Sequence, residues 1–265
     1  MKVRLADILS DKTSGASTLY RQTIALLIAA DDKYRTHSSL KGILRRLQKV
    51  FPEMAVFIYL KSRLDKTSPT DIPAVLRQLE REAETAQSSI GRRVDRIWQR
   101  PRRIVTYSQS SVVAEIIRRR KDKVTSVLIS CASPKNEGIT AAGKLAALGL
   151  SVNLVTDAAL PALIEKGDYL FLGADTVTEK YFVNKCGTWP LLMAAREKKA
   201  VSFVLFENFK KVSSRSFSFN PRQHPSAEIL TGRCPRIIVR NCYFEKIPLK
   251  LADWLISDQE AVRTT

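Results

Sequence analysis

The alternation of short β-rich runs with helical runs after Pro101 constrains the fold of this chain most strongly. Strands separated by helices of this length are typical of βαβ units in a parallel sheet. Right-handed crossovers place the helices on both faces of such a sheet. We therefore expect an α/β fold with a Rossmann-like, doubly wound, mostly parallel sheet. The expected strands are 103–107, 124–130, 151–156, 169–172 and 201–206, with later candidates at 236–239 and 254–257, and the expected helices are 111–120, 138–148, 158–165 and 188–198.

The residues before Trp98 have a different pattern, because their apolar side chains recur at helical spacing. Three stripes, within 19–27, 40–50 and 72–97, predict three or four amphipathic helices. The expected breaks are Asp31-Asp32, Phe51-Pro52 and Ser68-Pro69. We accordingly divide the chain into a helical N-terminal domain, residues 1–98, and a Rossmann-like α/β domain, residues 99–265. Residues 211–223 are Ser-rich and basic and predict a long loop.

Composition narrows the classes of protein. The chain has 265 residues, of which 45% are apolar, and this is enough to build a core. It contains neither an apolar run of roughly 18 residues that would span a bilayer nor the apolar segment of a signal peptide near Met1. We expect a cytoplasmic protein with no membrane partner. The four cysteines form no Cys-x-x-Cys pair, so we expect no metal, no cofactor and no disulfide framework.

The formal net charge of +18 favours a polyanionic or acidic partner. The cations form short clusters within 41–49, 92–103, 118–123 and 196–199. No aromatic residues are interleaved with them as in a platform that stacks single-stranded bases. Solvated helix faces are the alternative explanation, and an RNA partner stays open.

Polar residues follow the expected strands. Ligands of doubly wound sheets bind beyond the carboxyl ends of the strands. The residues at those positions are 107–111, 131–134, Asp157, 173–175 and 207–208. Neither a Gly-x-Gly-x-x-Gly motif nor a phosphate-binding loop ending in Gly-Lys is present, so the sequence does not support dinucleotide or nucleoside triphosphate chemistry.

The segment 173–188 is the most informative. A strand ends in Gly-Ala-Asp175, and Asn184-Lys185 precedes Gly187-Thr188, which opens a helix. Backbone N–H groups at a helix N-terminus beside a lysine suit a phosphate, and Asp175 is suited to bind sugar hydroxyls or to move a proton. We expect Asp175, Asn184 and Lys185 to face a polar pocket. Alternatively, Asp175 caps a turn and Asn184 stabilises the loop.

Several motifs in order resemble one family, which holds the alpha, beta and delta regulatory subunits of eukaryotic translation initiation factor 2B, 5-methylthioribose-1-phosphate isomerase and archaeal ribose-1,5-bisphosphate isomerase. The resemblance covers most of the chain. The matching segments are Gly15-Ala16-Ser17, Thr106 to Ser111, Pro134 with Gly138, Thr156-Asp157, Gly173-Ala174-Asp175, Asn184-Lys185-x-Gly187-Thr188 and Asn241-x-x-Phe244-Glu245 with Pro248. The resemblance implies a helical domain before a Rossmann-like domain, and a homodimer formed through the latter. It also implies ligand-binding roles for Gly15, Ala16, Ser17, Ser108, Ser110, Asp157, Asp175, Asn184 and Lys185.

Departures from the family pattern bear on function. The isomerases pair a Cys after the first strand with the Asp of Gly-Ala-Asp, and Ser108 stands at that Cys position. A hydroxyl is far less acidic than a thiol, and the sequence reveals no base beside it. Tyr107 stands where the family has a His, and Lys12 where it has an N-terminal Arg. Residues 131–134 match the family's Glu-x-Arg-Pro but lack its Arg. Cys131 is an alternative thiol, although a small residue at a strand end is the ordinary explanation.

Two functions follow from the resemblance and its departures. The first is an initiation-factor-2B-alpha-like regulatory protein, not a catalyst, that binds a sugar phosphate or nucleotide monophosphate and a translation-factor partner. The alternative is an aldose–ketose isomerase acting on a phosphorylated ribose, with Asp175 as the catalytic acid or base. The sequence leaves open whether the protein is an enzyme.

Overall fold

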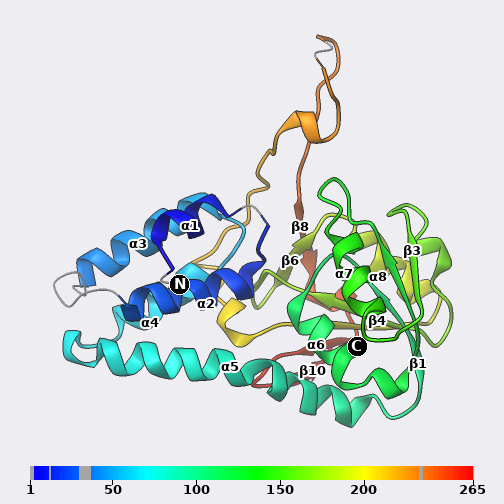
Figure 1. The fold of residues 1–265 in the computed structure, drawn as a ribbon, viewed down its shortest axis with the longest axis horizontal. Helices are drawn as coiled ribbons and strands as arrows, with labels where there is room; N and C mark the ends of the chain where they lie inside the picture. The colour runs from blue at the N-terminus through cyan, green and yellow to red at the C-terminus, as the bar shows by residue number, and fades with distance from the viewer. Residues whose placement is uncertain (1–2, 12, 30–36, 233–234, 265) are drawn as a thin grey trace.

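A computed structural model describes residues 3–11, 13–29, 37–232 and 235–264. Helices fill the first part of the chain, and a sheet covered by helices fills the second (Figure 1). Lys12, Cys234 and the expected break at Asp31-Asp32 lie outside the described residues. The division into two domains at residue 98 stays a prediction.

Among the described residues, five α-helices and one 3-10 turn precede the large sheet. They are α1 (Leu5–Ser10), α2 (Ala16–Ala29), α3 (His37–Val50), α4 (Val56–Asp65), η2 (Pro69–Asp71) and α5 (Ile72–Ile97). The apolar stripes of α2 to α5 meet in one core, which Phe209 joins from the second half of the chain. The stripes therefore predicted α2, α3 and α5, whereas α4 lies outside them and the six residues of α1 were too few to show a period.

The large sheet has seven strands in the order β10-β9-β7-β4-β1-β2-β3. They are β1 (Arg102–Thr106), β2 (Val124–Ser130), β3 (Val152–Val155), β4 (Tyr169–Gly173), β7 (Val201–Leu205), β9 (Trp254–Ile256) and β10 (Ala261–Arg263). All neighbours pair in parallel except β9 and β10. The prediction of a mostly parallel, doubly wound sheet is confirmed.

Helices cover both faces of this sheet. The helices α6 (Ser111–Arg119) and α7 (Glu137–Ala146) share a core with one face and the end of α5, and α8 (Thr188–Glu197) shares a core with the other face. The remaining 3-10 turns are η3 (Lys121–Lys123), η4 (Pro161–Leu163), η5 (Asn208–Lys210), η6 (Ser226–Glu228) and η7 (Leu249–Leu251). The expected helix at 158–165 is wrong in extent, since only η4 is helical there.

A second sheet of three strands was not predicted. It consists of β5 (Thr176–Val177), β6 (Tyr181–Lys185) and β8 (Phe244–Pro248), all antiparallel. The strand β6 carries Asn184 and Lys185, and β8 places Glu245 opposite Asn184. The C-terminal motif and the Asn-Lys motif are therefore neighbours in space.

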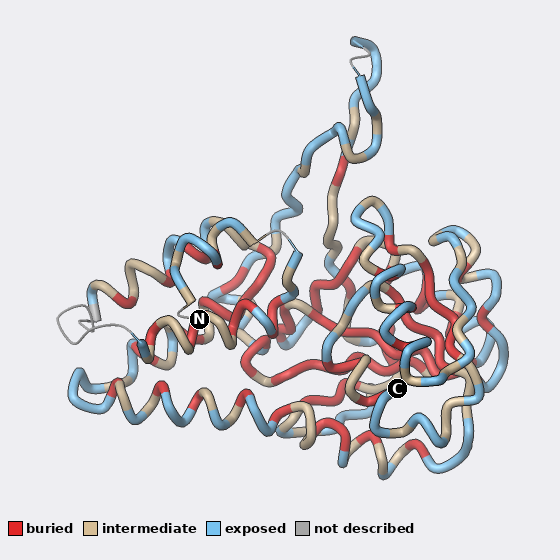
Figure 2. The backbone as a smooth tube through the Cα atoms, in the orientation of Figure 1, coloured by how far each residue is buried: buried red, intermediate tan, exposed pale blue. Residues whose placement is uncertain are grey.

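The expected strand at 236–239 is wrong. These residues lie on an irregular arm, about residues 220–232 and 235–242, which projects away from the rest of the chain (Figure 1) and is mostly exposed (Figure 2). Ile238 on the arm is 86% exposed. An apolar run such as 236–239 has the composition of a strand, but none of the described strands pairs with it.

No helix among the described residues is both long and apolar enough to cross a bilayer. Within the same residues, no group of three or more His, Cys, Asp or Glu side chains is arranged to hold a metal ion.

Candidate functional site

The carboxyl ends of β1, β4 and β7 bring charged and hydroxyl side chains together with η5, the end of β6 and the first residues of α2 and α7. We call seven of these residues the strand-end cluster: Ser17, Ser108, Glu137, Asp175, Lys185, Glu207 and Lys210. They come from segments far apart in the sequence, as the sheet topology requires.

One half of the cluster is centred on Glu137, the first residue of α7. Its Oε1 accepts a hydrogen bond from the Ser108 hydroxyl at 3.0 Å and one from Lys185 Nζ at 2.6 Å. The other carboxylate oxygen, Oε2, is buried and has no hydrogen-bond partner among the described residues. The expectation that no base lies beside Ser108 is therefore wrong, because α7 brings a carboxylate there that the sequence spacing did not reveal.

The other half is centred on Glu207, which lies two residues after the end of β7 and is fully buried. Lys210 Nζ lies 2.9 Å from its carboxylate, the Ser17 hydroxyl donates at 3.0 Å, and Gln87 Nε2 donates at 3.3 Å. Burial opposes ionisation of Glu207, but Lys210 and Ser17 outweigh it and lower the pKa of the carboxyl. A buried carboxylate with a lysine and two donors is a satisfied, charged group.

Asp175 lies between the two halves. Burial raises the pKa of its carboxyl, Lys210 and the backbone N–H of Ala16 lower it, and the charges of Glu207 and Glu137 add to the rise. The net direction is upward. A carboxyl that keeps its proton more tightly than usual is suited to act as an acid or a hydrogen-bond donor.

The N-terminus of α8 is occupied by a carboxylate of the protein itself. Glu245 Oε1 accepts the backbone N–H groups of Gly187 and Trp189, each at 2.9 Å. Gly187 has φ +106° and lies against the ring of Tyr107, so a side chain there would meet strain and a clash. A phosphate at this helix end, as the sequence suggested, would have to displace Glu245.

Asn184 is buried, and its amide donates to the Thr188 hydroxyl at 2.9 Å, so it holds the turn into α8. Asp157 accepts the backbone N–H groups of Ala132 and Ser133, each at 2.7 Å. Both contacts are those of loop-stabilising residues. For Asn184 this contact fits the alternative that the sequence left open, in which Asn184 stabilises the loop.

Ser110 caps α6 by accepting the N–H of Val113 at 3.4 Å. Its side chain packs so closely on Gly173 that a Cβ at that glycine would lie 2.6 Å from the hydroxyl oxygen. The first residue of the Gly-Ala-Asp motif is therefore glycine because α6 approaches the end of β4 there.

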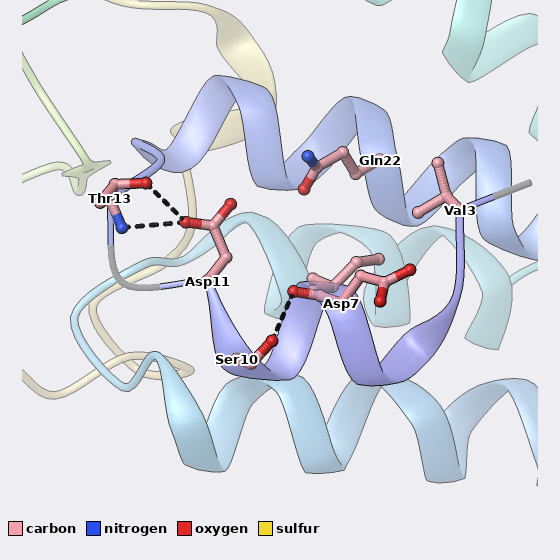
Figure 3. A pocket seen from close by; sticks show the side chains of 7 residues that line it. Val3, Asp7, Ser10, Asp11, Thr13 and Gln22 are labelled. Carbon is pink, nitrogen blue, oxygen red and sulfur yellow. Dashed lines mark hydrogen bonds between the residues drawn. The ribbon is translucent and has the colours of Figure 1, made fainter. Parts of the chain in front are cut away.

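The structure has two further cavities, of which one reaches the site. One of about 360 Å³ lies along α6 and α7 and reaches Ser108, Ser110 and Ser111. The other, of about 460 Å³, lies between α1, the loop after it and α2 (Figure 3). In that second cavity Asp11 accepts from Thr13 and Ser10 donates to the Asp7 carbonyl. Asp175, Asn184 and Lys185 line neither cavity. Asn184 donates instead to Thr188, and Lys185 to Glu137.

The structure thus brings Ser17, Ser108, Asp175 and Lys185 together, as the sequence suggested, with Gly15 and Ala16 at the start of α2 beside Asp175. Their ligand-binding roles, like those of Ser110, Asp157 and Asn184, stay predictions. Sequence reasoning missed Glu137, Lys210 and Gln87, although Glu207 stood at a strand end. Lys210 could have been found from its position three residues after Glu207, which places the two side chains close enough to pair.

A helical region, a doubly wound sheet and a charged cluster at the carboxyl ends of its strands define a Rossmann-like protein with a polar strand-end site. A family model described as "initiation factor 2 subunit family" matches residues 11–263, and the chain belongs to this family. The family resemblance inferred from the motifs is confirmed.

Known relatives carry two kinds of name. A "putative translation initiation factor eIF-2B subunit 2-like" from Pyrococcus furiosus is 26% identical over 96% of this chain and 93% of its own length. A "ribose 1,5-bisphosphate isomerase" from Methanocaldococcus jannaschii is 25% identical over 58% of this chain and 53% of its own. The crystal structure of the Pyrococcus horikoshii OT3 translation initiation factor eIF-2B has the same fold, with a TM-score of 0.82, 23% identity and coverage of 98% and 95% of the two chains.

Proposed function

We propose that this chain is a non-catalytic regulatory member of the family, which binds a sugar phosphate or nucleotide monophosphate at the strand-end cluster and acts through a protein partner. The single observation that carries the proposal is the state of Ser108. Its hydroxyl donates to Glu137, and the same carboxylate oxygen also accepts from Lys185. An alcohol is a much weaker acid than a thiol. The Glu137 oxygen already accepts a hydrogen bond from Lys185, so it is poorly placed to take the proton of the Ser108 hydroxyl and activate it.

The binding half of the proposal rests on Glu137 Oε2, the buried acceptor that has no partner among the described residues. Buried polar atoms are rarely left without a hydrogen bond. A ribose hydroxyl is a donor of the right kind, and Ser108 and Lys185 meet the same carboxylate. A sugar is therefore the part of the ligand that this half of the cluster fits best.

Binding of the ligand's phosphate requires a change in the charge balance of the cluster. The strand-end cluster holds three carboxylates and two lysines, and both lysines are already paired. A dianion that enters must take Lys185 or Lys210 from its carboxylate, or be accompanied by a proton. Asp175, whose pKa burial raises, is the group that would take the proton. We expect ligand affinity to fall as pH rises, with proton uptake on binding.

Thermal denaturation with ribose-1,5-bisphosphate, methylthioribose-1-phosphate and adenosine monophosphate tests the binding. At about 100 times the dissociation constant, a ligand that binds only the folded state adds about 2.7 kcal/mol, or a rise of about 5 °C or more in Tm. Free ribose and adenosine are the controls without phosphate. The Glu137→Gln variant should lose the shift, and Glu115→Gln, which changes a carboxylate on α6 that pairs with Arg118, should keep it. An unchanged Tm with every phosphate would contradict the binding proposal.

The alternative is an aldose–ketose isomerase for a phosphorylated ribose, and one observation favours it. The carboxyl of Asp175 has a pKa raised by burial at the strand ends, which is typical of a catalytic acid. Turnover of ribose-1,5-bisphosphate that Asp175→Asn abolishes would establish this alternative over the first. Cytoplasmic location, a homodimer and a translation-factor partner are further parts of the first proposal.

A further inference from the structure

Positive charge is concentrated in one stretch of the chain. Residues 92–123 contain eleven basic and three acidic residues, whereas residues 72–85 in the first half of α5 contain two basic and three acidic ones. The change falls within a single helix, α5, so its C-terminal half differs sharply from its N-terminal half.

The fold gathers this stretch at one place. The C-terminal ends of α5 and α6 are joined because Arg120 and Arg119 both reach Asp95, at 3.3 Å and 3.7 Å. Lys123, at the end of η3, donates to the carbonyl of Gln99 at 2.9 Å. Cations near the ends of helices are stabilised by the helix dipole, so the charges can collect there.

Much of this charge is not neutralised. Arg92, Arg96, Arg100 and Lys121 are exposed, and they form no ion pair with any described carboxylate. We call these four residues the basic end. Arg118 and Arg119, which are also exposed, have Glu115 and Asp95 as partners. An unpaired, single-signed group of cations projects a field into solvent.

The chemistry of the basic end favours a nucleic acid over a protein. None of the described residues between 92 and 123 is an exposed large hydrophobic residue, and Trp98 is fully buried. A protein interface would need an apolar or aromatic centre, and a single-stranded nucleic acid would need aromatic faces for stacking. Cations alone fit the phosphate backbone of a duplex, which they position without reading bases.

The location separates this surface from the strand-end cluster. Lys121 precedes β2, and the residues just after Arg100 begin β1, so Arg100 and Lys121 lie at the amino ends of the parallel strands. Arg92 and Arg96 come shortly before them, in the last turns of α5. The cluster lies at the carboxyl ends of the strands. Occupation of one need not block the other.

We propose that the basic end, Arg92, Arg96, Arg100 and Lys121, binds the phosphate backbone of a nucleic-acid duplex without sequence preference. The affinity should then fall steeply with salt, because each neutralised phosphate releases counterions.

Fluorescence anisotropy with a short labelled duplex RNA, titrated at several salt concentrations between about 50 and 200 mM, tests the proposal. The variant is Arg92→Gln with Arg96→Gln and Arg100→Gln. The matched control is Arg45→Gln with Arg46→Gln and Lys49→Gln, which removes the same charge from exposed positions on α3. We expect the first variant to bind about tenfold more weakly or worse, with a salt slope shallower by about 0.9 per lost contact. The control should stay close to the unmodified protein, and the Tm of both variants should show that they fold.

Three results would overturn the proposal. One is an equal loss in the two triple variants, which would indicate diffuse attraction to the net charge. Another is the absence of salt-dependent binding at low salt. The third is binding of poly-glutamate in preference to the duplex, which would indicate an acidic protein partner. Asp175→Asn should leave RNA affinity unchanged, so this result and the ligand test at the cluster are independent.

Discussion

The strand-end cluster and the basic end differ in how their cations are paired and buried. In the cluster, Lys185 and Lys210 are each bound to a carboxylate and both are buried. At the basic end the four cations are exposed and without an ion pair to any described carboxylate. Buried charges need an ion-pair partner because their desolvation is costly. Exposed cations near the C-terminal ends of helices need no such partner, because water solvates them and the helix dipole stabilises them. The comparison indicates that buried, paired charges suit a site for one small ligand, whereas exposed, unpaired cations attract a polyanion over a longer distance.

The largest expected effect comes from Lys210→Met, which leaves Glu207 buried without its cation. We expect a loss of about 3–5 kcal/mol in the free energy of unfolding, measured by urea denaturation. The matched control is Lys211→Met, since Lys211 pairs with Glu260 at the surface. An exposed pair contributes about 0–1 kcal/mol. Equal effects of the two changes would remove the contrast between buried and exposed charge.

The next effect concerns Glu245, which takes the N–H groups at the start of α8. We expect Glu245→Gln to cost about 0.5–1 kcal/mol of stability, because a negative charge at a helix N-terminus is stabilising. Millimolar inorganic phosphate should then raise the Tm of this variant more than that of the unmodified protein. Lys246→Gln, at the exposed neighbouring position, is the control. The same response to phosphate in both variants would show that Glu245 does not occupy an anion site.

A smaller effect, opposite in sign, is expected from Asp175→Asn. The pKa of this carboxyl is raised in the folded state by burial, so the folded protein holds the proton more tightly than the unfolded chain does. The contribution of this carboxyl to folding stability is therefore favourable at a pH below its usual pKa of about 3.9. That contribution is lost as the pH rises through the raised pKa of the folded state. The variant should therefore be the more stable one at pH 7, with the difference shrinking toward about pH 4. Urea denaturation across this range checks it, and a variant less stable at pH 7 would contradict the direction of the shift.

The smallest effect on stability is expected from Ser108→Cys, within about 0.5 kcal/mol. The nearby Glu137 carboxylate disfavours a thiolate, so the new thiol should react slowly with an alkylating reagent at pH 7. Glu137→Gln in the same background should speed the alkylation. Fast reaction without that second change would mean that the site still activates a thiol.

The parallel sheet and its helices could be predicted from the sequence because β-branched runs and helical spacing are local signals. The strand β6 could not, since its partner β8 lies about 60 residues away and the pairing is tertiary. For the same reason the apolar run 236–239 resembles a strand in sequence, although no strand in the described part of the chain pairs with it. Asp175 and Lys185 were found through a motif, but Glu137 and Lys210 enter the site from α7 and η5, and only the packed fold brings them there.

The central claim is that this member of the family binds at the strand ends without catalysing isomerisation. The most direct test is a turnover assay of the unmodified protein with ribose-1,5-bisphosphate, with Asp175→Asn beside it. The paired state of Ser108, Glu137 and Lys185 predicts no product above the level without protein. Clear product formation that disappears in Asp175→Asn would contradict it.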